Sequence, residues 1–122
     1  MINNNFEKKL KSKEFVFTAE TSPPDSTVRS EITDRVLCLK DLADAINVTD
    51  GASAKSHLSS LVVSSIIKDI EIEPILQLTT RDRNRIAIQS DLLGAWTLNI
   101  QNILCIYGCL LYTSPSPRDT LL

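Results

Sequence analysis

The chain has 122 residues, which suits one domain around one modest hydrophobic core and excludes a multidomain protein. Thirteen basic and fifteen acidic side chains give a formal net charge of −2, and hydrophobic residues make up 43% of the chain. This composition is typical of a globular protein and favours neither disorder nor nucleic-acid binding. No apolar run approaches the roughly 20 residues of a membrane-spanning helix, and no signal-peptide core follows Met1, so we expect a cytoplasmic protein without membrane contact.

The cysteine and histidine content is low. Cys38, Cys105 and Cys109 are an odd number and form no Cys-x-x-Cys pair, and the single histidine, His57, has no neighbouring ligand or triad partner in the sequence. Disulfide frameworks and zinc sites need more such residues at characteristic spacings. We therefore expect reduced, structural thiols, no metal, and a histidine in a loop.

Segments typical of strands alternate with segments typical of helices. After a polar, lysine-rich lead at 6–13, β-forming residues predict strands at 14–20, 44–49, 74–78 and 102–107. Apolar residues at helical spacing predict helices at 28–43, 58–66 and 85–97. Ser26 or Thr27 is available to cap the first helix, and Trp96 falls on the apolar face of the last, where we expect it to belong to the core.

The expected strands end at regular intervals. Their ends at Glu20, Thr49, Thr79 and Gly108 are 29, 30 and 29 residues apart. Such alternation predicts an α/β fold with a parallel sheet, and a (β/α)8 TIM barrel of roughly 250 residues divides into units of this length. The alternative, an open doubly wound sheet, usually has a glycine-rich loop after its first strand, whereas residues 21–25 contain two prolines and no glycine. The pattern favours the barrel, with only its first four strand-helix units present.

The last fourteen residues differ in character from the rest. From Cys109 a strand-like run changes to a segment rich in serine and proline, and Pro115 and Pro117 exclude a helix there. The string resembles the conceptual translation of a sequencing-library adapter. We therefore predict that 1–108 form the domain and that 109–122 are artefactual, with a genuine flexible tail as the alternative.

Polar residues stand at the expected carboxyl ends of the strands, where parallel α/β folds gather their functional side chains. Glu20 is the carboxylate that ends the expected first strand, directly after residues 15–19. At a half-buried strand end it would favour its protonated form, as a general acid requires; an ion pair with an arginine is the alternative. Thr49 and Asp50 precede Gly51, where a flat ligand could approach the backbone closely; a turn-forming Asp50 is the alternative.

Arg81, Asp82, Arg83 and Asn84 open the third expected helix. Two arginines are unfavourable at the positive end of a helix dipole, so an anion could compensate them. Guanidinium groups beside free backbone N–H donors would hold a phosphate or carboxylate. Solvated surface charge is the alternative.

Three motifs occur together in an order and spacing that characterise one enzyme family. They are FTAETSPP at 17–24, NVTDG at 47–51 and QLTTRDRNRIAIQSDLLGA at 77–95. Residues 15–108 thereby resemble the amino-terminal half of methylenetetrahydrofolate reductase, and the third motif is the most specific of the three.

The resemblance implies a (β/α)8 barrel that holds a flavin, FAD or alternatively FMN, at the carboxyl ends of its strands. It also implies NAD(P)H as co-substrate and a folate as substrate, because the family reduces 5,10-methylenetetrahydrofolate to 5-methyltetrahydrofolate. Glu20 matches the general acid of the family. The matching cofactor-binding positions are Thr49, Gln77, Thr79, Tyr107 and Gly108, and Gln77 stands where many relatives have a histidine.

The chain departs from the family pattern at Cys109, where the family has an aspartate near the flavin and the folate. If residues 109–122 are artefactual, Cys109 marks the point where the family sequence is cut off and not an evolved substitution. The resemblance then implies an incomplete fragment that is inactive alone. The full-length enzyme is expected to be a homo-oligomer. Two kinds of alternative stay open: a pterin-binding methyltransferase or an aldolase-like lyase on the same barrel without flavin, and a binding module in which Arg81, Arg83 and Arg85 hold an anion without catalysis.

Overall fold

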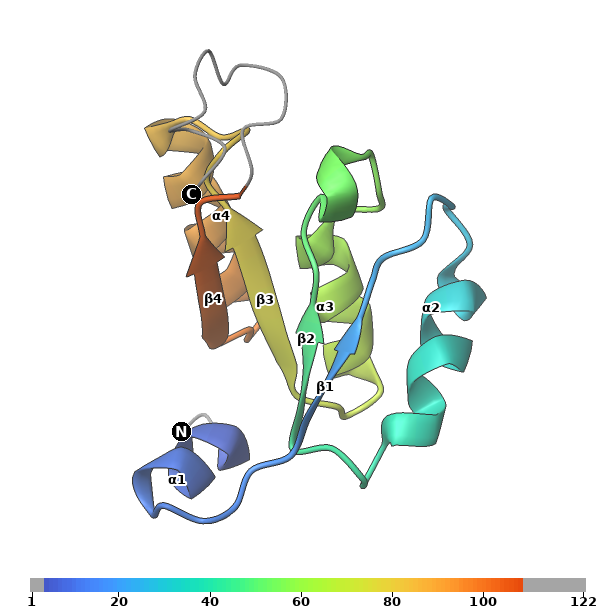
Figure 1. Ribbon diagram of the computed structural model, residues 1–122, viewed down its shortest axis with the longest axis vertical. Helices are drawn as coiled ribbons and strands as arrows, with labels where there is room; N and C mark the ends of the chain where they lie inside the picture. Colours follow the sequence, from blue (N-terminus) through green and yellow to red (C-terminus); the bar gives the residue numbers. More distant parts are fainter. Residues whose placement is uncertain (1–3, 109–122) are drawn as a thin grey trace.

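The computed structural model describes residues 4–108 of the chain, in which strands and helices alternate (Figure 1). The strands are β1 (Thr18–Thr21), β2 (Ala45–Val48), β3 (Pro74–Thr79) and β4 (Asn102–Ile106). The α-helices are α1 (Asn5–Lys11), α2 (Arg29–Val36), α3 (Ser60–Asp69) and α4 (Arg85–Thr97). Short 3-10 helices follow α2 at Leu37–Leu39 and β2 at Ala52–Ala54.

The strands form one parallel sheet in the order β1-β2-β3-β4. Helices α2, α3 and α4 cover the same face of this sheet (Figure 1). The expected α/β class with a parallel sheet is therefore confirmed. A doubly wound sheet carries helices on both faces and reverses its strand order, whereas sequential strands with helices on one face are the arrangement within a (β/α)8 barrel. The closed barrel stays a prediction.

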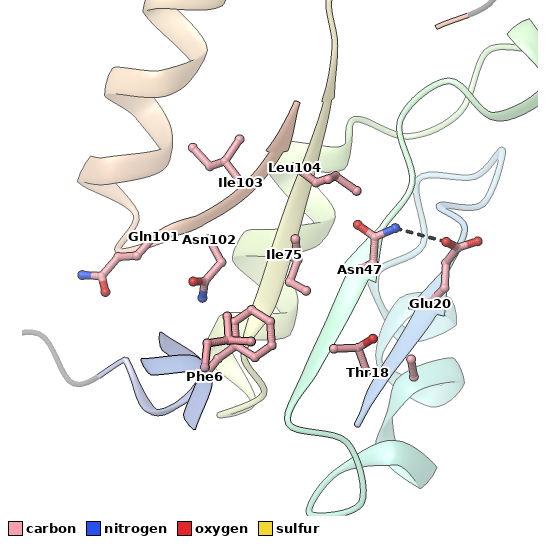
Figure 2. Close-up of a pocket in the computed structure, with 11 residues that line it drawn as sticks. Phe6, Thr18, Glu20, Asn47, Ile75, Gln101, Asn102, Ile103 and Leu104 are labelled. Carbon is pink, nitrogen blue, oxygen red and sulfur yellow. Dashed lines mark hydrogen bonds between the residues drawn. The ribbon is translucent and has the colours of Figure 1, made fainter. Parts of the chain in front are cut away.

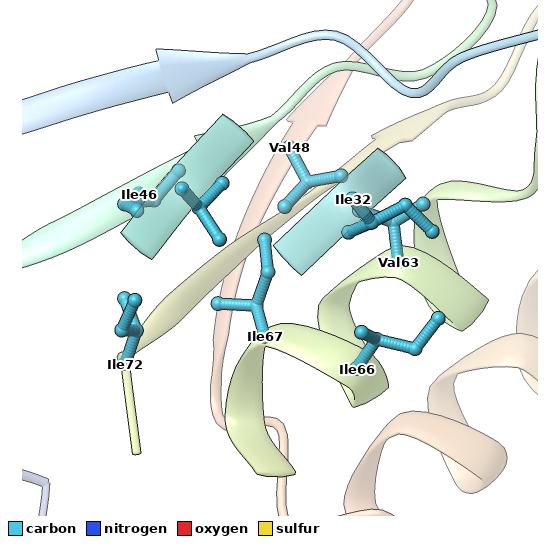
Figure 3. Packing of buried hydrophobic residues seen from close by; sticks show 8 residues of the cluster. Ile32, Ile46, Val48, Val63, Ile66, Ile67 and Ile72 are labelled. Carbon is cyan, nitrogen blue, oxygen red and sulfur yellow. The ribbon is translucent and has the colours of Figure 1, made fainter. Parts of the chain in front are cut away.

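The hydrophobic core lies between the sheet and its helices. Figure 3 shows its larger cluster, which joins α2, β2, α3 and the loop before β3: Ile32, Val36, Ile46, Val48, Val63, Ile66, Ile67 and Ile72. A smaller cluster of Leu76, Ala95 and Ile100 lies between β3 and α4. Burial of one such aliphatic side chain contributes about 1.5–3 kcal/mol. Because strand side chains alternate, Asn47 and Gln77 point to the opposite face, away from the helices.

The first strand is shorter than the sequence predicts. β1 begins at Thr18, opposite Ala45 of β2, and residues 14–17 precede the sheet. The prediction of a strand from residue 14 was therefore wrong, and the Phe15 side chain is 86% exposed. High β-propensity does not create a strand where no neighbouring backbone is available to pair with it.

The helix after β1 is also shorter than the predicted range 28–43. α2 ends at Val36, and the following turn is a 3-10 helix. Val28 occupies the N-cap position without a side-chain cap, so the prediction of a Ser26 or Thr27 cap was wrong. The Ser26 hydroxyl instead accepts a hydrogen bond from the Val28 N–H at 3.1 Å, one residue before the helix begins.

A helix that the sequence did not indicate occupies part of the polar lead. Asn4 caps α1 by accepting a hydrogen bond from the Glu7 N–H at 3.0 Å, and its side-chain amide donates to Asn102 at 3.0 Å. α1 lies at the amino-terminal end of the sheet (Figure 1). Its polar composition hid it, because only Phe6 and Leu10 mark an apolar side.

The structure corrects two expectations about buried residues. Trp96 is 64% exposed, and Ala95 is the residue of α4 that is buried against the sheet. Cys38 and Cys105 are free thiols on the surface and not part of the packed core, whereas Cys109 lies outside the described residues.

Within 4–108 no helix combines the length and apolar character needed to cross a membrane, and no cluster of side chains is suited to a metal ion. The segment 109–122 also lies outside the described part, so its assignment as artefactual stays a prediction.

We expect acid to loosen α1 from the sheet. Asp44 accepts hydrogen bonds from Lys9 of α1 and from the Phe17 N–H, and these bonds hold the pKa of Asp44 below its ordinary value of 3.8. The bond to Asp44 also raises the pKa of Lys9 above 10.5. Because the pKa of Asp44 is lower in the folded than in the unfolded chain, its ionised form stabilises the folded state at pH values above 3.8. This stabilisation is lost as the pH falls through the lower pKa that Asp44 has in the folded state.

The measurement is an NMR titration from pH 7 toward pH 2 that follows the Phe17 amide and the amides of α1. Their signals should shift together at the low end of this range. Asp69→Asn is the matched control, because Asp69 pairs with Arg29 on the surface, away from α1. Asp44→Asn should loosen α1 at pH 7, where the Asn4–Asn102 hydrogen bond still holds its N-cap; unchanged α1 signals in that variant would contradict the prediction.

Candidate functional site

Three polar side chains form a row across the face of the sheet that the helices leave open. They are Glu20 of β1, Asn47 of β2 and Gln77 of β3, and we call them the polar row. The Asn47 amide nitrogen donates to Glu20 Oε2 at 3.1 Å and to Gln77 Oε1 at 3.2 Å. Figure 2 shows the bond between Asn47 and Glu20 at the edge of a largely apolar pocket of about 670 Å³. The row thus joins three successive strands near their carboxyl ends.

Glu20 is exposed, which corrects the expectation of a half-buried carboxyl. The partner that the structure gives it is the uncharged Asn47 amide, and not one of the arginines considered as the alternative. Only Oε2 is engaged in this bond, so the carboxyl group can present its other oxygen to a ligand over the open face of the sheet.

Thr49 and Thr79 are buried at the carboxyl ends of β2 and β3. The Thr49 hydroxyl donates to Ser22 Oγ at 3.1 Å, and the Thr79 hydroxyl donates to the Asp50 carbonyl oxygen at 3.2 Å. Each hydroxyl therefore ties one strand-to-helix loop to its neighbour. A ligand could use only the remaining lone pairs of these oxygens, since their protons are engaged.

Asp50 and Arg83 form a partly buried ion pair beside these threonines. The Asp50 carboxylate accepts a hydrogen bond from the Thr79 N–H at 2.8 Å and further hydrogen bonds from both terminal nitrogens of Arg83. The Nε of Arg83 also donates to the Asp91 carboxylate at 3.1 Å. The bond to Asp50 raises the pKa of Arg83, although burial opposes the charge. The Asp50 side chain therefore joins the loop after β2 to β3 and to the segment before α4, and a Cβ added at Gly51 would lie 3.4 Å from the Arg81 guanidinium. The charge of Arg83 is balanced by Asp50 and Asp91, so Arg83 itself gives no support to an anion-binding module.

Tyr107 and Gly108 follow the end of β4. The Tyr107 side chain is exposed, and its carbonyl oxygen accepts the Arg81 N–H at 3.0 Å. Gly108 has a φ of +88°, and a Cβ added there would lie 2.6 Å from Thr79 Cγ2. Glycine is therefore required at this position for two reasons, its backbone conformation and its contact with β3.

The sequence did not identify three residues that shape this region. Asn47 is the central residue of the polar row, and the Ser22 hydroxyl accepts the hydrogen bond from Thr49. The two ring nitrogens of His57 lie 2.9 Å from the Pro23 carbonyl oxygen and 3.1 Å from the Ala52 carbonyl oxygen. His57 lies in a loop, as expected, and there it links the segments that follow β1 and β2. Asn47 could have been found from its place between Ile46 and Val48, because alternation turns it toward the open face.

The fold and the polar row define an α/β protein with polar side chains at the carboxyl edge of a parallel sheet, the edge at which α/β enzymes carry their active sites. The family model of methylenetetrahydrofolate reductase matches residues 5–116, so the chain belongs to this family. This membership relates it to enzymes of folate-dependent one-carbon metabolism. No curated protein matches the sequence significantly.

Proposed function

We propose that this segment is part of a flavin-dependent reductase that converts 5,10-methylenetetrahydrofolate to 5-methyltetrahydrofolate with NAD(P)H. The observation that carries the proposal is the exposed Glu20 carboxyl at the head of the polar row, in a chain that belongs to the reductase family. Glu20 would donate the proton that the folate needs when its five-membered ring opens to an iminium ion. Positioned acids of this kind typically contribute about 10²–10⁴-fold to a rate.

The residues present fit a flavin, FAD or alternatively FMN, at the carboxyl edge. Gln77 keeps its amide nitrogen as a donor, because its bond to Asn47 uses Oε1, and Tyr107 offers an exposed aromatic ring. Thr49, Thr79 and Gly108 would form the wall beneath the cofactor. When bound, the flavin would supply hydride transfer between nicotinamide and folate, while the protein supplies orientation and the proton.

We further propose that 1–108 form the first four units of a (β/α)8 barrel and that 109–122 are artefactual. The sequential parallel sheet supports the first part, because β1 and β4 each pair on one side only within the described residues. The complete enzyme, meaning the eight-unit reductase that contains this segment, would be a cytoplasmic homo-oligomer. A pterin-binding methyltransferase without flavin is distinguished by the absence of a flavin absorption band.

The chain expressed alone should neither retain flavin nor reduce the folate. Half of the expected strands are missing from its sheet, so the cofactor would have contacts on one side only, and open strand edges favour self-association. The measurement is the visible spectrum after purification with added FAD, together with NADH oxidation in the presence of the folate.

The complete enzyme is the matched control and should show both the flavin band and turnover. A stoichiometric flavin complex with turnover in the isolated chain would contradict the proposed truncation. A complete enzyme without flavin would contradict the proposed function itself.

A further inference from the structure

Asn47 occupies the centre of the polar row and has both of its amide N–H groups engaged. The register of the sheet sets Glu20 of β1 directly opposite Asn47 of β2, and Gln77 lies on the next strand. The Asn47 nitrogen reaches Glu20 Oε2 at 3.1 Å and Gln77 Oε1 at 3.2 Å. A single side chain thereby connects the carboxyl group of one strand to the amide of another.

The orientation of this amide is fixed by its acceptors. Asn47 Oδ1 is buried and has no hydrogen-bond partner among the described residues. Rotating the amide by half a turn would set this oxygen against the Glu20 carboxylate and would lose both hydrogen bonds. The buried position would hold an unpaired group in either orientation, the oxygen as observed or the amide nitrogen after rotation, so the two acceptors decide which orientation is adopted.

We propose that Asn47 positions Glu20. Its amide nitrogen holds Oε2 of Glu20 and stabilises the carboxylate that remains after the proton has left. This inference rests on the proposed role of Glu20 as the acid. The Asn47 N–H already faces Oε2, so the carboxylate that forms on proton transfer has a hydrogen-bond donor in place without rearrangement. Since Asn47 holds one oxygen, the other is directed to the open face of the sheet.

The test uses the complete enzyme with Asn47→Leu, which keeps a similar shape but removes the donor. Stopped-flow kinetics measure flavin reduction by NAD(P)H and flavin reoxidation by the folate separately. Reoxidation should slow by about tenfold, the effect of losing one hydrogen bond to a charged group, while flavin reduction stays unchanged. The folate concentration that gives half the maximal rate should also stay unchanged, because Asn47 acts on the acid and not on folate binding.

The matched control is Asn102→Leu, which changes the same residue type at the other end of the same face. Asn102 binds Glu73 and Asn4, so this variant should lower stability and leave both half-reactions at their normal rates. If Asn47→Leu does not fold, Asn47→Ala removes the same donor with less bulk.

A double-mutant cycle separates positioning from general damage. In a Glu20→Gln background, Asn47→Leu should add little further slowing, because the group that it positions no longer carries the proton. Full additivity, or an unchanged rate in Asn47→Leu while Glu20→Gln is slow, would overturn the role of Asn47 alone. Normal folate reduction by Glu20→Gln would instead overturn the proposed function, and the Asn47 inference with it.

Discussion

Glu20→Gln in the complete enzyme is expected to leave flavin reduction by NAD(P)H at its normal rate and to slow folate reduction by about 10²–10⁴-fold. Only the second half-reaction needs a proton on the folate. Glutamine has the same shape, and its carbonyl oxygen can still accept the hydrogen bond from Asn47 that the structure shows at 3.1 Å. The substitution therefore removes the proton while keeping the geometry of the polar row.

Stopped-flow absorbance of the flavin measures both half-reactions in one instrument. Glu14→Gln is the matched control, because Glu14 is an exposed carboxylate that binds the Ser12 hydroxyl before β1 begins. That variant should be indistinguishable from the parent enzyme in both steps. Equal slowing of the two half-reactions by Glu20→Gln would show that Glu20 supports flavin binding or folding and not proton transfer.

From β1 onward the sequence predicted the order of the strands and α-helices, because their signals are local. Strands β2 and β3 are short apolar runs that end at polar residues, and the regular distance between strand ends already indicated parallel pairing. Glu20 was identifiable as a carboxylate at such a strand end. The signals failed where a tertiary partner decides the outcome, as at Phe15, which has the propensity for a strand but no neighbouring strand.

The interactions that cross between units could not be predicted in the same way. Asn47 bonds to residues 27 and 30 positions away, and Arg83 bonds to Asp50 at a distance of 33 positions. The arginine-rich opening of α4 therefore looked like an anion site, since the carboxylate that balances it belongs to another loop. Trp96 shows the same limit, because α4 also exposes apolar Ile86 and Leu93 and its spacing does not single out the buried side.

Arg83→Met is expected to lower the free energy of unfolding of the chain by about 2 kcal/mol, because the pair is partly buried and its effect falls between those of an exposed and a fully buried ion pair. The side chains of Arg83 and Asp50 are 22% and 11% exposed, and Arg83 also donates to the Thr79 carbonyl oxygen at 2.7 Å. Removing the guanidinium would leave the Asp50 carboxylate without its cation. The loops after β2 and β3 would then lose the contact that joins them.

Urea unfolding at low protein concentration, followed by the fluorescence of the single tryptophan, measures this change. The matched control is Arg29→Met, whose partner is Asp69 and whose pair is 65% and 63% exposed, so its loss should lower stability by less than about 1 kcal/mol. Asp50→Asn combined with Arg83→Met should recover part of the lost stability, because no unpaired charge remains. Equal effects of Arg83→Met and Arg29→Met would show that the Asp50 pair is screened by solvent and does not hold the two loops together.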